Sequence, residues 1–126
     1  MIYLPDTNVL IGVITNRKPY AALLERLLSE HHLLATCSVI VSEIYNGMRP
    51  AEEAKTHTLL ERLEFLPTTF EIARQGGMIR RDFARRGRTL TLADTSIAAT
   101  AMAYKCTLIT ENTRDFPLPE LHLLAP

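Results

Sequence analysis

The sequence predicts an α/β fold built on a short-stranded parallel sheet with helices on both faces. Short apolar segments of strand length alternate with longer segments in which apolar residues recur at helical spacing. The strand candidates are apolar almost throughout, which is typical of parallel strands buried on both faces. This alternation favours right-handed crossovers, and such sheets bind ligands beyond the carboxyl ends of their strands.

The composition fits one compact domain spanning residues 1–126. Apolar residues make up 47% of the chain, which is too many for a disordered segment. Lys plus Arg and Asp plus Glu each total 14, so the net charge does not indicate a polyanionic partner. Two cysteines, Cys37 and Cys106, are too few for a disulfide framework, and we expect buried free thiols. No apolar run reaches the length of a membrane span and no secretory signal is visible, which favours the cytoplasm.

The first part of the chain is expected to hold two strands and two helices. Residues 1–4 and 33–36 are apolar runs of strand length. A brief helix is expected over residues 8–14. A longer helix is predicted over 19–30, where leucines recur at helical spacing and Pro19 suits the first turn.

The middle of the chain is expected to be mainly helical. Ser38 is a candidate cap for a helix that runs through Met48 and is ended by Pro50. Residues 51–64 are predicted to form the next helix. Residues 65–67 are expected as a short strand or as a plain connection.

The last part of the chain begins with two helices. A long amphipathic helix is predicted over 69–86, and the Gly76–Gly77 pair inside it either weakens the helix or allows close packing. Thr91 is expected to cap an alanine-rich helix that runs to about Tyr104. The remaining elements expected are a strand at 106–109, a turn at 112–116 and a last strand at 121–124.

Acidic residues recur where such a fold would place a ligand site. Asp6 follows the first strand directly, and residues 112–115 follow a later strand. Asp94 is expected in the first turn of its helix, and Glu43 about one turn into the helix after the second strand. All of them can therefore reach one rim of the sheet.

Each acid also has a structural explanation. Asp6 could cap the next helix, and Asp94 at the third helical position would complement the helix dipole. Asp115 could be an ordinary turn residue. Glu43 is harder to explain structurally because residues 39–44 are otherwise apolar, and a carboxylate there is costly unless it is paired or metal-bound. The joint placement of the acids is what favours a functional role.

Carboxylates gathered at one sheet edge point to a hard divalent cation, Mg²⁺ or Mn²⁺. Close carboxylates raise one another's pKa values, and a bound cation removes that repulsion. One or two such ions could activate water and stabilise charge on a phosphate, which indicates phosphodiester chemistry. The four histidines lack the spacing of a zinc site, so we expect them as surface or packing residues.

Four segments of the chain carry a family resemblance. They are Asp6-Thr-Asn-Val-Leu-Ile, Ser42-Glu43-Ile-Tyr-Asn-Gly, Leu92-Ala-Asp94-Thr-Ser-Ile-Ala-Ala-Thr-Ala and Thr110-Glu-Asn112-Thr-Arg-Asp115-Phe. In order and spacing across residues 2–116 they resemble the motifs of the PIN-domain ribonucleases, in particular the VapC-type toxins of toxin–antitoxin pairs. The resemblance implies a three-layer α/β/α sandwich and RNA cleavage that depends on Mg²⁺ or Mn²⁺. It also implies a small VapB-like antitoxin as partner, and homodimers or toxin–antitoxin hetero-oligomers.

The resemblance assigns the acids to a catalytic metal site. Asp6, Glu43 and Asp94 match the metal acids of the family. The fourth position is open: Asn112 could ligate through its carbonyl oxygen or through water, and Asp115 could ligate or orient a ligand. Asp115 is counted with the three acids as catalytic.

Supporting positions follow from the same resemblance. Thr7 and Asn8 match residues that support the metal acids, and Thr110 matches a hydroxyl that supports the fourth position. Pro5 departs from the family, whose members more often carry a plain apolar strand residue there, and it could shift Asp6 slightly. A proline is tolerated at the end of a strand.

A basic segment precedes Asp94. Residues 74–88 contain six arginines against one acid, Asp82. These arginines either contact RNA phosphates or the antitoxin, or form the solvated face of a helix. The apolar helices over 19–28 and 51–66 could form an antitoxin groove, although core packing explains most of their leucines. The candidates for contact with RNA or the antitoxin are Arg80, Arg81, Arg85, Arg86 and Arg88.

Two other functions fit the sequence less well. A receiver-like or phosphatase-like domain needs an Asp pair or Asp-x-Asp after the first strand, where this chain has Asp-Thr-Asn. A catalytically degenerate PIN-like module would bind a protein partner or RNA without cleaving it. The retention of all four acids argues against that module.

Overall fold

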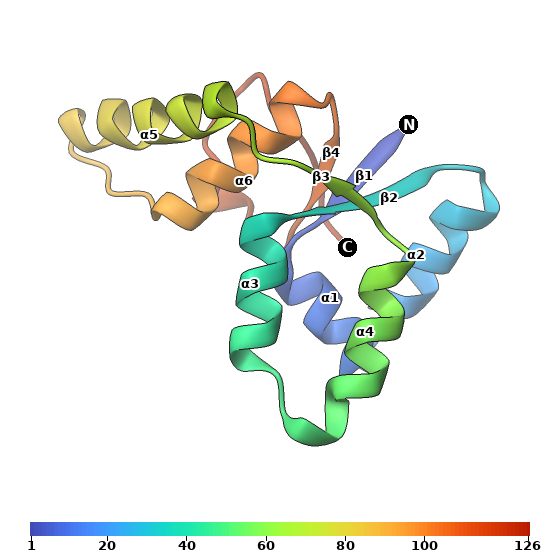
Figure 1. The fold of residues 1–126 in the computed structure, drawn as a ribbon. Coiled ribbons are helices and arrows are strands. Elements are labelled where there is room, and N and C mark those ends of the chain that lie inside the picture. Colours follow the sequence, from blue (N-terminus) through green and yellow to red (C-terminus); the bar gives the residue numbers. More distant parts are fainter.

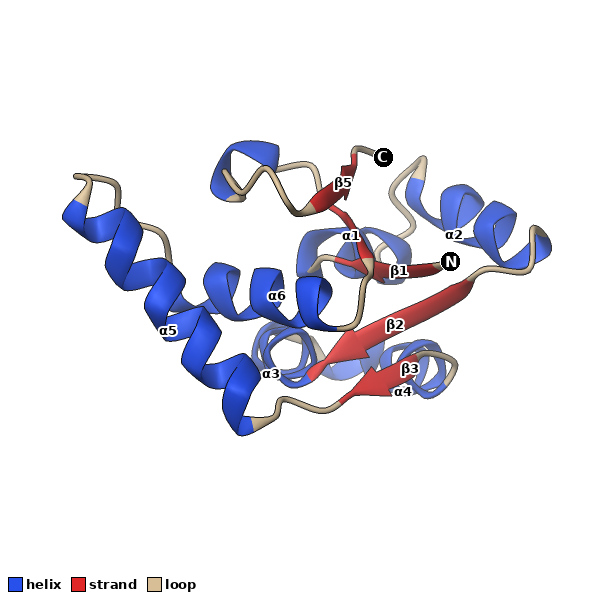
Figure 2. Cartoon of the chain, turned by 90° about the horizontal axis from the view of Figure 1, so that it is seen from above, coloured by secondary structure: helices blue, strands red, loops and turns tan.

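The computed structural model describes residues 1–126 and contains one parallel sheet flanked by six α-helices (Figures 1 and 2). The five strands lie in the order β3-β2-β1-β4-β5, which confirms the predicted fold class. The strands are β1 (Ile2–Pro5), β2 (Leu33–Cys37), β3 (Glu64–Leu66), β4 (Thr107–Ile109) and β5 (His122–Leu124). The helices are α1 (Thr7–Ile14), α2 (Tyr20–Ser29), α3 (Ser38–Gly47), α4 (Glu53–Glu61), α5 (Phe70–Arg85) and α6 (Leu92–Ala103). Two 3₁₀ turns are η1 (Pro50–Glu52) and η2 (Thr113–Asp115).

The strand order reverses at the centre of the sheet. The chain passes from β1 to β2 and β3 on one side, and then crosses to β4 and β5 on the other. β1 pairs with β4 through Tyr3 opposite Thr107 and Pro5 opposite Ile109. Ligands of open parallel sheets bind at such a reversal, beyond the carboxyl ends of the strands. The segments that follow β1 and β4 therefore occupy the expected position of a site.

The helices form separate layers. In Figure 1, α1 to α4 lie below the sheet, whereas α5 and α6 lie at the upper left. The core between them is fully buried and aliphatic, with Leu4 and Leu108 from the sheet, Ile40 from α3 and Ile97 from α6. None of the helices combines the length and apolar character needed to cross a membrane.

Both C-terminal helices begin with a threonine cap, of which the sequence predicted the one at Thr91. The Thr69 side chain accepts a hydrogen bond from the Ile72 amide at 3.2 Å and begins α5. Helix α5 continues through Gly76, where an added Cβ would lie 3.2 Å from the Ser96 Cα atom of α6. Gly76 therefore serves close packing, and the glycine pair does not interrupt the helix.

Two local predictions for the middle of the chain are wrong. Cys37, not Ser38, occupies the N-cap position of α3, and the Ser38 hydroxyl instead lies 3.0 Å from that of Thr68. The helix expected over 51–64 begins as the turn η1 and ends at Glu61. It stops there because Glu64 pairs with β2 as the first residue of β3, so sheet pairing overrides local helix preference.

Candidate active site

Asp6 lies at the carboxyl end of β1 in the centre of the rim. Its backbone amide donates to the Ile109 carbonyl of β4 at 2.8 Å, so the β1–β4 pairing continues past Pro5. The side chain is buried, with 7% of its residue surface exposed. One carboxylate oxygen accepts from the Thr7 amide at 2.8 Å, and the other accepts from the Thr110 hydroxyl at 2.9 Å. Asp6 is thus both the cap of α1 and a fixed carboxylate of the rim.

Glu43 approaches the same region from α3. Its carboxylate accepts a hydrogen bond from the Thr7 hydroxyl at 2.6 Å. The expectation that this side chain is desolvated is wrong, because α3 buries Ile40 and Ile44 and leaves Glu43 exposed. Thr7 therefore links the first two acids: its amide binds Asp6 and its hydroxyl binds Glu43.

Asp94 is placed by the start of α6. Thr91 caps this helix, and its hydroxyl accepts a hydrogen bond from the Asp94 amide at 3.0 Å. The Asp94 residue is part-buried. The sequence prediction of Thr91 as cap and Asp94 in the first turn is confirmed.

The fourth segment is the turn η2, which follows β4. The Asn112 amide donates to the Thr110 hydroxyl at 3.0 Å, and the Asp115 amide donates to the Asn112 carbonyl at 2.9 Å. Thr110 is fully buried, so one hydroxyl joins Asp6 to this turn. The side chains of Asn112 and Asp115 are exposed, as is Asn8, which forms no side-chain hydrogen bond.

The four carboxylates influence one another electrostatically. Burial raises the pKa of Asp6, hydrogen bonds from Thr110 and Thr7 partly oppose this, and the charges of Glu43 and Asp115 raise the pKa further. Burial likewise raises the pKa of Asp94, against the hydrogen bond with Thr91. The charges of the other three acids then raise it further. The fold therefore brings together acids from four separate segments of the chain.

The residues present fit a hard divalent cation. Their donor atoms are carboxylate oxygens, which Mg²⁺ and Mn²⁺ prefer. None of the four acids forms an ion pair, because the ion pairs of the chain join other residues: His57 with Glu53, Arg74 with Glu71 and Arg81 with Asp82. No three His, Cys, Asp or Glu side chains stand in a ready-made ligand arrangement, which accords with like-charge repulsion. A cation would relieve the repulsion that raises these pKa values.

Cys37 lies close to these acids, a placement that sequence reasoning missed. Burial raises the pKa of its thiol, and the charges of Asp6 and Glu43 raise it further. The signal was its position at the end of β2, beside the strand that ends in Asp6. Its raised pKa keeps the thiol protonated, and Cys37 is a buried free cysteine, as is Cys106.

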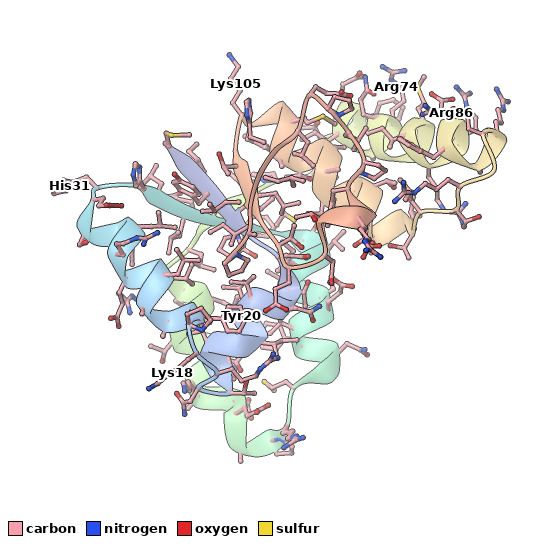
Figure 3. The ribbon with its side chains drawn as sticks, turned by 180° about the vertical axis from the view of Figure 1, so that it is seen from behind. Lys18, Tyr20, His31, Arg74, Arg86 and Lys105 are labelled. Carbon is pink, nitrogen blue, oxygen red and sulfur yellow. The ribbon has the colours of Figure 1, made fainter.

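The arginines of the basic segment have different roles. Arg80, Arg81 and Arg85 line an open groove of about 890 Å³ that extends to Thr91 and Leu92 at the start of α6. Arg74 and Arg86 point away from the body of the molecule on α5 (Figure 3). The Arg74 guanidinium pairs with Glu71, and that of Arg86 stacks over the Phe83 ring at 4.1 Å. Arg88 instead donates a hydrogen bond to the Arg114 carbonyl of η2.

The apolar helices α2 and α4 leave little open space between them. The crevice between α1, α2 and α4 has a volume of about 70 Å³. Leu24 and Leu27 of α2 are buried in the core, and Leu59 and Leu60 of α4 pack against it. Core packing therefore explains most of these leucines.

Comparisons with known proteins agree with this geometry. A family model described as the PIN domain matches residues 3–118. Ribonuclease VapC2 of Rickettsia felis is 30% identical over 98% of this chain and 96% of its own length. Ribonuclease VapC19 of Mycobacterium tuberculosis is 29% identical over 92% of this chain and 94% of its own length. The crystal structure of VapBC2 from Rickettsia felis, bound to a DNA fragment from their promoter, superposes with a TM-score of 0.88 at 26% identity, covering 100% of this chain and 99% of that one.

Proposed function

Because the chain belongs to the PIN domain family, we propose that it is a metal-dependent endoribonuclease and the toxin of a toxin–antitoxin pair. The single observation that carries this proposal is the convergence of four carboxylates, without a basic partner, at the reversal point of the sheet. The relatives at about 30% identity over nearly the whole chain are ribonucleases by name. The enzyme would act in the cytoplasm, where RNA is available.

Asp6, Glu43 and Asp94 would hold the cation. We assign the fourth position to Asp115 over Asn112, because the Asp115 carboxylate acts on the pKa values of both Asp6 and Asp94. When bound, Mg²⁺ or Mn²⁺ would supply Lewis-acid chemistry to water and to the scissile phosphate.

The neighbouring hydroxyls hold the acids in position. Thr110 and the Thr7 amide each bind one oxygen of Asp6, which fixes the plane of that carboxylate. The Thr7 hydroxyl occupies one oxygen of Glu43 and leaves the other free. Fixed carboxylates require little reorganisation during the reaction, which is how preorganised sites lower barriers.

RNA cleavage by the purified protein tests the proposal. With Mg²⁺ or Mn²⁺ the wild type should cut cellular RNA at defined positions, mapped by sequencing the new 5′ ends. Asp6→Asn and Asp94→Asn should each lose cleavage by at least about 10³-fold, while circular dichroism shows an unchanged fold. Glu30→Gln, an exposed acid at the end of α2, is the matched control and should cleave as the wild type does.

A second experiment tests the toxin assignment. Expression of the wild type should arrest growth, and co-expression of the short protein encoded beside it should restore growth through a VapB-like complex. Light scattering would then report a homodimer of the free protein or a toxin–antitoxin hetero-oligomer. A wild type that binds RNA but never cleaves it, with or without Mn²⁺, would instead establish a degenerate binding module.

A further inference from the structure

Arg88 is held by the way α5 ends. Gly87 adopts a positive φ of 82°, a conformation that glycine takes without strain. The Gly87 amide donates to the Ala84 carbonyl at 3.0 Å, and the Arg88 amide donates to the Phe83 carbonyl at 2.9 Å. These two bonds form a Schellman motif, which closes the helix and fixes the backbone of Arg88.

The Arg88 side chain extends from this turn to η2. Its guanidinium donates a hydrogen bond to the Arg114 carbonyl oxygen. The next amide, that of Asp115, donates to the Asn112 carbonyl at 2.9 Å. The peptide group between Arg114 and Asp115 is therefore hydrogen-bonded through both its oxygen and its N–H. A peptide plane held at both ends fixes the direction in which the Asp115 side chain leaves the backbone.

The same linker also organises a second acid. Residues 86–91 join α5 to α6, and Leu90 anchors them in the core with 6% exposure. Arg88 holds the turn that carries Asp115, and Thr91 caps the helix that carries Asp94. The linker between α5 and α6 thus touches two of the four acidic segments.

We propose that Arg88 is a positioning residue of the nuclease site, whose guanidinium holds the Arg114–Asp115 peptide so that Asp115 faces Asp6 and Asp94. This inference rests on the proposed function, because it assigns Arg88 a role in the same site. It replaces the sequence-based expectation that Arg88 contacts RNA or an antitoxin. An arginine that serves RNA would act on substrate affinity, whereas one that positions an acid acts on the site before RNA arrives.

The experiment therefore measures the site without RNA. Arg88→Ala should speed amide hydrogen exchange at Asp115, because the Asp115–Asn112 hydrogen bond loses its support. Mn²⁺ affinity, measured by calorimetry, should fall roughly 10- to 100-fold, the usual cost of losing a group that orients a metal ligand. The kcat for RNA should fall by a similar factor, while KM changes less than about threefold.

Two further variants make the comparison specific. Arg85→Ala removes the same charge from the same helix end, but the Arg85 side chain forms no hydrogen bond or ion pair with η2, whereas Arg88 bonds to it. It should leave Asp115 exchange and Mn²⁺ affinity as in the wild type. Arg88→Lys keeps a charged donor on a shorter side chain and should recover part of both losses. If Arg88→Ala does not fold, Arg88→Gln, which is too short to reach the carbonyl, takes its place in every measurement.

Wild-type Asp115 exchange and wild-type Mn²⁺ affinity in the Arg88 variant would overturn the inference. A raised KM with both of these unchanged would also overturn it, and would identify Arg88 as a phosphate contact. The two proposals fail separately. If the wild type cleaves no RNA but exchange and Mn²⁺ affinity respond to Arg88→Ala, only the proposed function is lost. If the wild type cleaves RNA and neither responds, only the role of Arg88 is lost.

Discussion

The Thr110 hydroxyl donates a hydrogen bond to Asp6 Oδ2 at 2.9 Å, although the two residues are 104 positions apart in the sequence. Both residues are buried at the carboxyl ends of neighbouring strands. The same hydroxyl accepts from the Asn112 amide at 3.0 Å. Because a hydroxyl has one proton to donate and lone pairs to accept with, Thr110 orients the carboxylate and the following turn together.

Thr110→Val should therefore weaken the site more than the fold. The substitution keeps the side-chain shape, removes one hydrogen bond to Asp6 and leaves the Asn112 amide without its partner. We expect the free energy of unfolding to fall by about 1–3 kcal/mol in chemical denaturation. Cleavage should fall roughly 10- to 100-fold, as for other groups that orient metal ligands. Thr110→Ser restores the hydroxyl and should recover most of the activity; an inactive Ser variant would argue that packing of the methyl group matters instead.

The adjacent glycines of α5 should respond differently to alanine. An added Cβ at Gly77 would meet nothing within 4 Å, so Gly77→Ala should raise the free energy of unfolding by about 0.5–1 kcal/mol through helix propensity. An added Cβ at Gly76 would lie 3.2 Å from the Ser96 backbone. Gly76→Ala should not show this stabilisation, because the added Cβ crowds the Ser96 backbone. The larger side chain in Gly76→Val should destabilise the protein by about 1–3 kcal/mol. Equal urea midpoints for the two alanine variants would contradict the close packing of α5 on α6.

The stability of the metal-free protein should depend on pH through Asp94. Burial raises the pKa of Asp94 in the folded protein above its ordinary value of 3.8, which it has in the unfolded chain. At pH values between the unfolded-state pKa and the folded-state pKa, the folded state binds more protons than the unfolded state. The free energy of unfolding therefore falls as pH rises through this window. The Asp94→Asn variant has no carboxylate at this position, so its free energy of unfolding should not fall for this reason as pH rises.

The measurement is the Tm of Asp94→Asn minus that of the wild type. Without divalent cations, this difference should increase between pH 4 and pH 7. Added Mg²⁺ should reduce the difference by stabilising the wild type. A difference that shrinks as pH rises would show that the Asp94 carboxylate is stabilised, not strained, by its surroundings. Glu30→Gln is again the control for an exposed carboxylate.

The groove on α5 should contribute to RNA affinity through charge. Arg80 and Arg85 line it without an acidic partner, whereas Arg74 pairs with Glu71. In an Asp6→Asn background, Arg80→Ala and Arg85→Ala should each weaken binding and lower the slope of log affinity against log salt by about 0.7. Arg74→Ala should leave the slope unchanged. Unchanged slopes for all three variants would show that the arginines of the groove do not contact RNA phosphates.

Local patterns were sufficient for much of the fold. Helical spacing of apolar residues predicted α2 and α5, and the alanine-rich segment with its Thr91 cap predicted α6. The pattern did not predict where α4 ends, because Glu64 is taken into the sheet by pairing with β2. Sheet pairing is a long-range contact, and it overrode the helix preference of the segment.

The exposure of Glu43 is another feature that the local sequence pattern did not predict. An apolar stretch around a carboxylate suggested burial, yet α3 turns that side chain outward and buries Ile40 and Ile44. The chain alone indicates which residues are apolar. Which side of the helix faces the core depends on what packs against it.

The amino-acid sequence was enough to predict the fold class, the cap at Thr91 and the candidate acids Asp6, Glu43 and Asp94, because these follow from local spacing and from motifs that resemble a family. Which hydroxyl binds which acid, and which peptide group Arg88 binds, became visible in the folded chain. Those contacts exist because β4 lies beside β1 and the α5–α6 linker reaches η2. They are side-chain contacts between residues distant in the chain. Their geometry is set only when the strands pair in the order of this sheet.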